Sequence, residues 1–166
     1  MKNEIVELPS PATSKNKISN GLSGFFGSPV ALMRLSAILF VGLTAGHLSA
    51  YPFARENAPL EKQLVGSMKH VRFEFLGEYT TYWNLYFGWG IFIAVLLLTL
   101  AFVLWFLADI APLTPRRIGV ITGLLSAASF ACAYLSYRFF FIPPFLLLLI
   151  IGLIMLKTAI QLLRKV

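Results

Sequence analysis

The sequence predicts an all-α integral membrane protein, built as a four-transmembrane-helix bundle with an amphipathic surface helix between spans 1 and 2. Of the 166 residues, 58% are hydrophobic and only 13% are charged, against roughly a quarter charged in an ordinary globular domain. Four apolar runs each reach the length of about 20 residues that a helix needs to cross the hydrocarbon core. Between the first two runs, apolar residues recur at helical spacing among charged ones, which is typical of a helix lying on the membrane surface.

The chain divides into a tail and one membrane domain. Residues 1–28 are polar and rich in proline, glycine and asparagine, so we expect a flexible cytoplasmic tail without a secretory signal peptide. Residues 29–166 form the membrane domain, and its first span covers about 29–51. Gly42 and Gly46 lie four residues apart in this span and offer a smooth face to another helix.

The connection after the first span is the longest in the chain. Its apolar residues fall on one helical face, with charged residues elsewhere, which predicts an amphipathic helix on the membrane surface. These apolar residues are Leu60, Leu64, Met68, Val71 and Phe75.

The remaining spans are expected at about 79–107, 116–137 and 145–163. Gly119 and Gly123 repeat the four-residue spacing of Gly42 and Gly46. We therefore expect the first and third spans to pair through these small residues.

The distribution of lysine and arginine predicts the orientation. Nine of the 14 fall on the side of the two termini and of the 109–117 turn, and five fall on the other side. Cytoplasmic loops carry the excess of basic residues. Both termini are thus expected on the cytoplasmic side of the membrane, which we expect to be a bacterial inner membrane. Residues 52–90 and 138–144 are expected on the outer side.

The most distinctive stretch is 77–90, at the start of the second span. If it is helical, Tyr79, Tyr82, Tyr86 and Trp89 line one stripe. Such a stripe is either an aromatic belt at the membrane interface or the wall of a pocket. Asn84 favours the pocket, because an amide that faces lipid is poorly satisfied.

The box Tyr-Trp-Asn-Leu-Tyr-Phe-Gly-Trp-Gly at 82–90 resembles the Tyr-Trp-Asp-x-Tyr-x-Gly-Phe-Gly signature of small, uncharacterised bacterial four-helix membrane proteins. The order of elements over 60–156 is similar as well. This resemblance implies the four-span architecture and no activity. The chain departs from the signature at Asn84, where the family has aspartate, so proton chemistry by that carboxylate could not occur here.

Polar residues at the outer ends of three spans could converge on one half-buried pocket, the usual form of a small-ligand site. Glu78 and Arg138 could form an ion pair there, or only hold the bundle together. His47 is either a functional residue of the pocket or is bonded to a neighbouring helix. The candidate ligand-binding residues are His47, Tyr51, Glu78, Tyr82, Asn84, Tyr86, Tyr134, Tyr137 and Arg138.

Motifs of the common soluble enzymes are absent: no metalloprotease, phosphate-loop, nucleophile-elbow or Cys-x-x-Cys pattern occurs. The lone Cys132 and two distant histidines predict no metal site, and no cofactor is expected. The net charge of +7 is explained by the basic residues at the ends of the spans and does not indicate that the protein binds nucleic acid.

Three functions remain. The first is a non-catalytic binding or accessory protein for a lipid-like molecule or a partner membrane subunit. The alternative is a membrane-embedded enzyme acting on a lipophilic substrate, of the isomerase or quinone-linked type. The third is a transporter subunit, which would require the chain to oligomerise. The sequence leaves open whether the chain forms a homo-oligomer.

Overall fold

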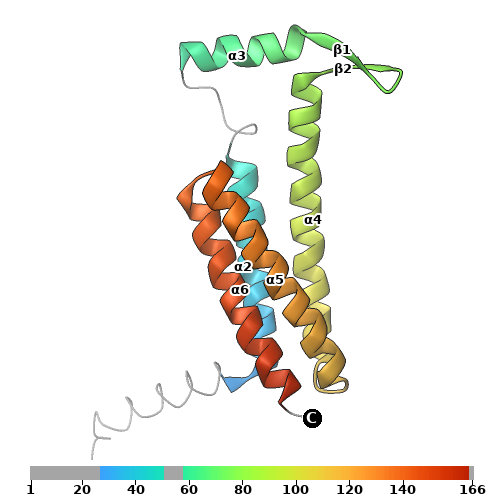
Figure 1. The fold of residues 1–166 in the computed structure, drawn as a ribbon, viewed down its shortest axis with the longest axis vertical. Helices are drawn as coiled ribbons and strands as arrows, with labels where there is room; N and C mark the ends of the chain where they lie inside the picture. Colours follow the sequence, from blue (N-terminus) through green and yellow to red (C-terminus); the bar gives the residue numbers. More distant parts are fainter. Residues whose placement is uncertain (1–26, 51–57, 165–166) are drawn as a thin grey trace, which may run out of the picture.

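The computed structural model describes residues 27–50 and 58–164. Figure 1 shows their elements in chain order: α2 (Pro29–Ser49), α3 (Pro59–His70), β1 (Arg72–Phe75), β2 (Glu78–Thr81), α4 (Tyr82–Ile110), α5 (Pro115–Phe139) and α6 (Ile142–Leu163). Four of these helices, α2, α4, α5 and α6, are long and apolar enough to cross a membrane. The predicted all-α integral membrane protein with four spans and a surface helix is therefore confirmed. Most of the predicted tail (1–26) and Tyr51 lie outside the described residues.

Capping residues set where the spans begin. Ser28 Oγ accepts a hydrogen bond from Ala31 N at 3.4 Å before α2, and Thr81 Oγ1 accepts one from Asn84 N at 3.1 Å before α4. Proline occupies the first turn of α3, α5 and α6, where its missing N–H costs nothing. The fourth span consequently begins at Ile142 rather than at the predicted 145.

The stretch before α4 differs from the prediction. The surface helix ends at His70, and residues 72–81 form an antiparallel hairpin in which Arg72 pairs with Thr81. The sequence Arg-Phe-Glu-Phe of β1 alternates charged and aromatic residues. This two-residue period is typical of a strand, whereas the sequence pattern had predicted a helix over these residues. Tyr79 therefore lies on β2, and the predicted aromatic stripe begins on α4 only at Tyr82.

The turn of this hairpin contains two residues with positive φ, Leu76 at 55° and Gly77 at 88°. Two-residue hairpin turns require this conformation, which glycine adopts freely. Leucine adopts it at a cost of roughly 1–2 kcal/mol. The Leu76 side chain is 92% exposed at the tip, so no packing in the described chain offsets that strain.

The spans pack in the order α5, α6, α2, α4, since the extensive interhelical contacts are α5 with α6, α6 with α2, and α2 with α4. Their shared core includes the fully buried Leu104, Ile151 and Met155. Figure 1 shows α5 leaning away from α4 above the turn that joins them. The first turns of α4 rise beyond the other spans to the hairpin, and α3 extends sideways from there, above the other spans in this view.

The structure does not bring together the two small-residue faces expected to pair. A Cβ on Gly119 would lie 3.0 Å from Leu163, so this glycine packs against α6. At Gly42 and Gly46 a Cβ would meet nothing within 4 Å, and both residues are exposed. The short link between α5 and α6 makes these helices antiparallel neighbours, and this connection decides the pairing.

Gly152 on α6 is the small residue that the sequence analysis passed over. A Cβ at this position would lie 2.8 Å from the Phe130 ring of α5. Beside it, Ser126 Oγ donates a hydrogen bond to Gly152 O at 2.8 Å. The α5–α6 contact thus combines close backbone approach with an interhelical hydrogen bond, as membrane helix pairs commonly do.

Candidate functional site

The aromatic residues that open α4 attach it to the surface segment (residues 59–81, α3 with the β1–β2 hairpin). Tyr82 lies against Phe73 of β1 with ring centroids 4.5 Å apart. Lys69 of α3 places its Nζ 4.5 Å from the centroid of Trp83, a favourable cation–π arrangement. The first half of the aromatic box therefore holds the surface segment on the end of α4.

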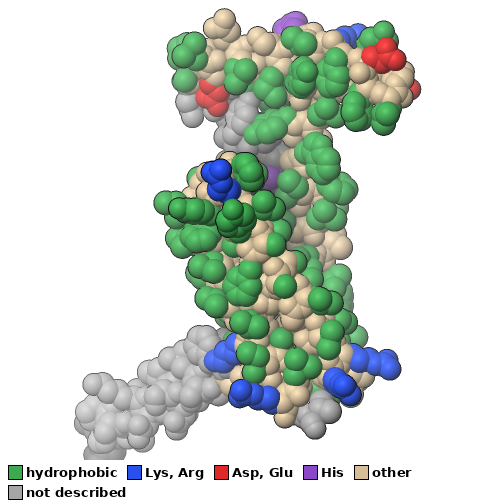
Figure 2. Space-filling view, viewed as in Figure 1, with side chains coloured by type: hydrophobic (Ala, Val, Ile, Leu, Met, Phe, Trp, Pro, Cys, Tyr) green, Lys and Arg blue, Asp and Glu red, His purple; other side chains and the backbone are tan. Residues whose placement is uncertain are grey.

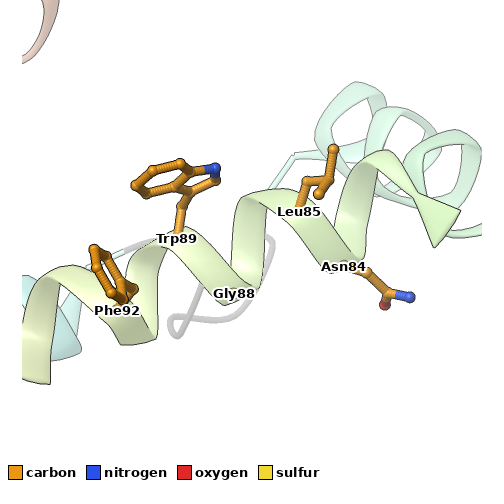
Figure 3. Close-up of a pocket in the computed structure, with 5 residues that line it drawn as sticks. All are labelled: Asn84, Leu85, Gly88, Trp89 and Phe92. Atoms are coloured by element: carbon orange, nitrogen blue, oxygen red, sulfur yellow. The ribbon is translucent and has the colours of Figure 1, made fainter. Parts of the chain in front are cut away.

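The second half of the box lines a shallow groove of about 290 Å³, hereafter the α4 groove. Figure 3 shows its residues, all from this one helix: Asn84, Leu85, Gly88, Trp89 and Phe92. Gly88 lies between Asn84 and Phe92 on one ridge, and a Cβ there would meet nothing within 4 Å. The groove thus exists because Gly88 has no side chain.

The walls of the α4 groove have different chemistry. Trp89 and Phe92 meet edge to face with centroids 5.6 Å apart and form an apolar wall. Asn84 contributes a carboxamide at the end nearest the surface segment, and its side chain is exposed. Of these residues, the sequence pattern singled out Asn84 and Trp89. Leu85 and Phe92 could have been added from their i, i+4 and i+7 spacing with Trp89.

His47 connects α2 to the turn of α4 that contains Gly90. Its Nε2 lies 2.9 Å from Gly90 O. Because a carbonyl oxygen only accepts, Nε2 must carry the proton and donate. The structure therefore corresponds to the alternative in which this histidine is bonded to a neighbouring helix.

The other predicted pocket residues are not brought together. Glu78 lies exposed on β2, while Arg138 lies exposed at the end of α5 with its guanidinium 6.0 Å from the Phe139 centroid. Tyr137 packs on Phe145 of α6 at 5.4 Å. Tyr134 is exposed on α5, and Tyr86 is exposed on α4.

The ion pair of the described chain joins different residues from those predicted. Arg34 Nη2 of α2 donates to Asp109 Oδ1 of α4 at 2.7 Å, and the Arg34 guanidinium also lies 5.3 Å from the Trp105 centroid. Nothing local in the sequence signals a pair that is 75 residues apart. No Glu78–Arg138 pair is present among the described residues.

No group of three or more metal-ligating side chains occurs within residues 27–50 and 58–164. Cys132 lies exposed on α5.

Comparisons with protein-family models, with curated proteins and with solved structures find no match to the chain. The arrangement of its own residues is therefore what bears on function.

Proposed function

We propose that this integral membrane protein acts non-catalytically, as an accessory protein that binds a transmembrane helix of a second polypeptide in the α4 groove. The observation that carries the proposal is the groove itself: a glycine notch on a membrane-spanning helix, lined by that helix alone. A groove with one helical wall is completed only when another molecule lies against it.

The surroundings of the groove support a helix as the occupant. Of the most apolar 18-residue stretch of α4, 22% is buried, against 33%, 39% and 44% in α5, α6 and α2. Helices associate in membranes where small residues allow close approach and where amides can bond across the contact. Gly88 supplies the first feature, and Asn84 supplies the second.

The distribution of charge supports an orientation with the groove on the outer side. Arg34, Arg116, Arg117 and Arg164 lie at the end of the spans opposite the surface segment, and Figure 2 shows Lys and Arg gathered there. The surface segment itself carries both signs. Under the positive-inside rule the chain would place the ends of its spans near Arg116 and Arg164 in the cytoplasm, as in the inner membrane of a bacterium.

The other functions receive less support. A lipid-like ligand would fit the apolar wall, but its binding does not require the close backbone approach that Gly88 allows. An enzyme that uses His47 and Glu78 would need them together, whereas His47 is bonded to Gly90 on α4 and Glu78 lies on β2.

Native mass spectrometry of the protein, released from its membrane in a mild detergent, tests the proposal. We expect a discrete added mass equal to a polypeptide, lost in Gly88→Leu, which fills the notch. Gly42→Leu is the matched control, because that glycine also lies exposed on a span with open space around it. A bare chain with heterogeneous lipid, or equal retention in both variants, would rule the proposal out. An added small-molecule mass lost only in Gly88→Leu would replace the helix with a lipid-like ligand.

A further inference from the structure

The last turns of α6 carry a second groove, distinct from the α4 groove and at the opposite end of the spans. It has a volume of about 360 Å³ and is hereafter the α6 groove. Its lining combines apolar and basic side chains: Leu153, Leu156, Lys157, Ile160, Gln161 and Arg164.

The polar residues of the α6 groove form one stripe. Lys157, Gln161 and Arg164 follow the i, i+4, i+7 spacing of a single helical face. Lys157 lies six residues before the end of α6 at Leu163, or about 9 Å along the axis. The stripe therefore places two exposed cations, Lys157 and Arg164, about 10 Å apart along one face of the helix.

The charges at this end of the molecule are predominantly positive. Arg116 and Arg117 begin α5, which packs on the end of α6 through Gly119 and Leu163. Among the described residues, Asp109 is the acid at this end, and it is bonded to Arg34 at 2.7 Å. The described carboxylates therefore leave a net positive field around the α6 groove.

From this combination we propose that the α6 groove binds an anionic phospholipid. The headgroup phosphate lies between Lys157 and Arg164, and an acyl chain follows Leu153, Leu156 and Ile160 toward the membrane centre. Leu153 and Ile160 are seven residues apart, or about 10 Å along the helix. An acyl chain that follows them stays within one leaflet of a hydrocarbon core about 30 Å thick. Both cations are exposed, so a lipid can enter sideways from the bilayer.

This proposal is independent of the partner helix in the α4 groove and can be tested on the purified full-length chain. The delipidated protein is mixed with equal amounts of phosphatidylglycerol and phosphatidylcholine that carry the same acyl chains. Native mass spectrometry then gives the ratio of the two bound lipids. We expect phosphatidylglycerol to predominate. Each of Lys157→Gln and Arg164→Gln should lower the ratio about fivefold, the effect of one basic side chain near an anionic lipid.

The control removes one cation from the same end of the molecule. Arg116→Gln takes away a charge that does not line the groove, so only the surrounding field weakens and the lipid ratio should fall by less than twofold. Lys157→Arg should keep the preference, and far-ultraviolet circular dichroism should show each variant helical. No preference for phosphatidylglycerol, or a loss in Arg116→Gln equal to that in Lys157→Gln and Arg164→Gln, would overturn the site.

Discussion

Gly152→Ala tests the packing of the spans most sharply, because the structure states what the added methyl group would meet. Its Cβ would lie 2.8 Å from one carbon of the Phe130 ring and 2.9 Å from another. Carbon atoms pack at about 3.5–4.0 Å. The Phe130 ring must therefore move away from residue 152, or α5 must move away from α6, by roughly 1 Å. Overpacking of this kind costs about 1–3 kcal/mol. The Ser126–Gly152 hydrogen bond at 2.8 Å would lengthen as well, which places the expected loss in the upper half of that range.

The measurement is the free energy of unfolding from a titration with sodium dodecyl sulfate in mixed micelles, followed by circular dichroism. Gly42→Ala serves as the control, since its Cβ would meet nothing within 4 Å. We expect the control to leave stability unchanged or to raise it by up to about 1 kcal/mol, because alanine favours a helix interior over glycine. Phe130→Leu in the Gly152→Ala background should recover part of the loss, because the two sites are in contact. Equal stabilities for Gly152→Ala and Gly42→Ala would refute the close α5–α6 packing.

Three further changes have defined outcomes. Asp109→Asn should lower the same unfolding free energy by only about 0.2–1 kcal/mol, because the Arg34 and Asp109 side chains are 45% and 53% exposed; a loss above 2 kcal/mol would contradict that exposure. Tyr82→Ala removes the ring contact with Phe73, worth about 0.5–1.5 kcal/mol, so amide exchange in β1 and β2 should quicken while α5 exchanges as before; unchanged hairpin exchange would disprove this attachment. Leu76→Asn should slow amide exchange in the hairpin, since asparagine accepts positive φ more readily than leucine does; faster exchange would mean that the Leu76 side chain stabilises the turn.

The sequence predicted the spans because their signal is redundant: roughly 20 apolar residues in a row have few alternatives to a membrane helix. It missed the hairpin because the two-residue period of β1 extends over only four residues. Over that length, the helical spacing of Val71 and Phe75 fits as well as the strand alternation of Phe73 and Phe75.

The predicted pocket required the outer ends of the spans to lie at the same level. The periodicity of a sequence does not determine that level. Glu78 was expected at the start of a helix beside Arg138, but the hairpin carries it to β2 beyond the ends of the other spans. Pairing of small-residue faces depends likewise on connection length and helix rotation. Gly42 and Gly119 have the same local pattern, yet only Gly119 lies against another helix of the described chain.

A partner helix in the α4 groove can be captured by photo-crosslinking in intact native membranes. The photoreactive p-benzoylphenylalanine replaces Phe92, in the wall of the groove, or Leu124, an exposed residue of α5 that serves as control. We predict one discrete crosslinked polypeptide from position 92, absent from position 124 and abolished by Gly88→Leu; its mass shows whether the partner is a second copy of the chain. Lipid adducts alone, or the same products from both positions, would show that no partner helix lies in the α4 groove.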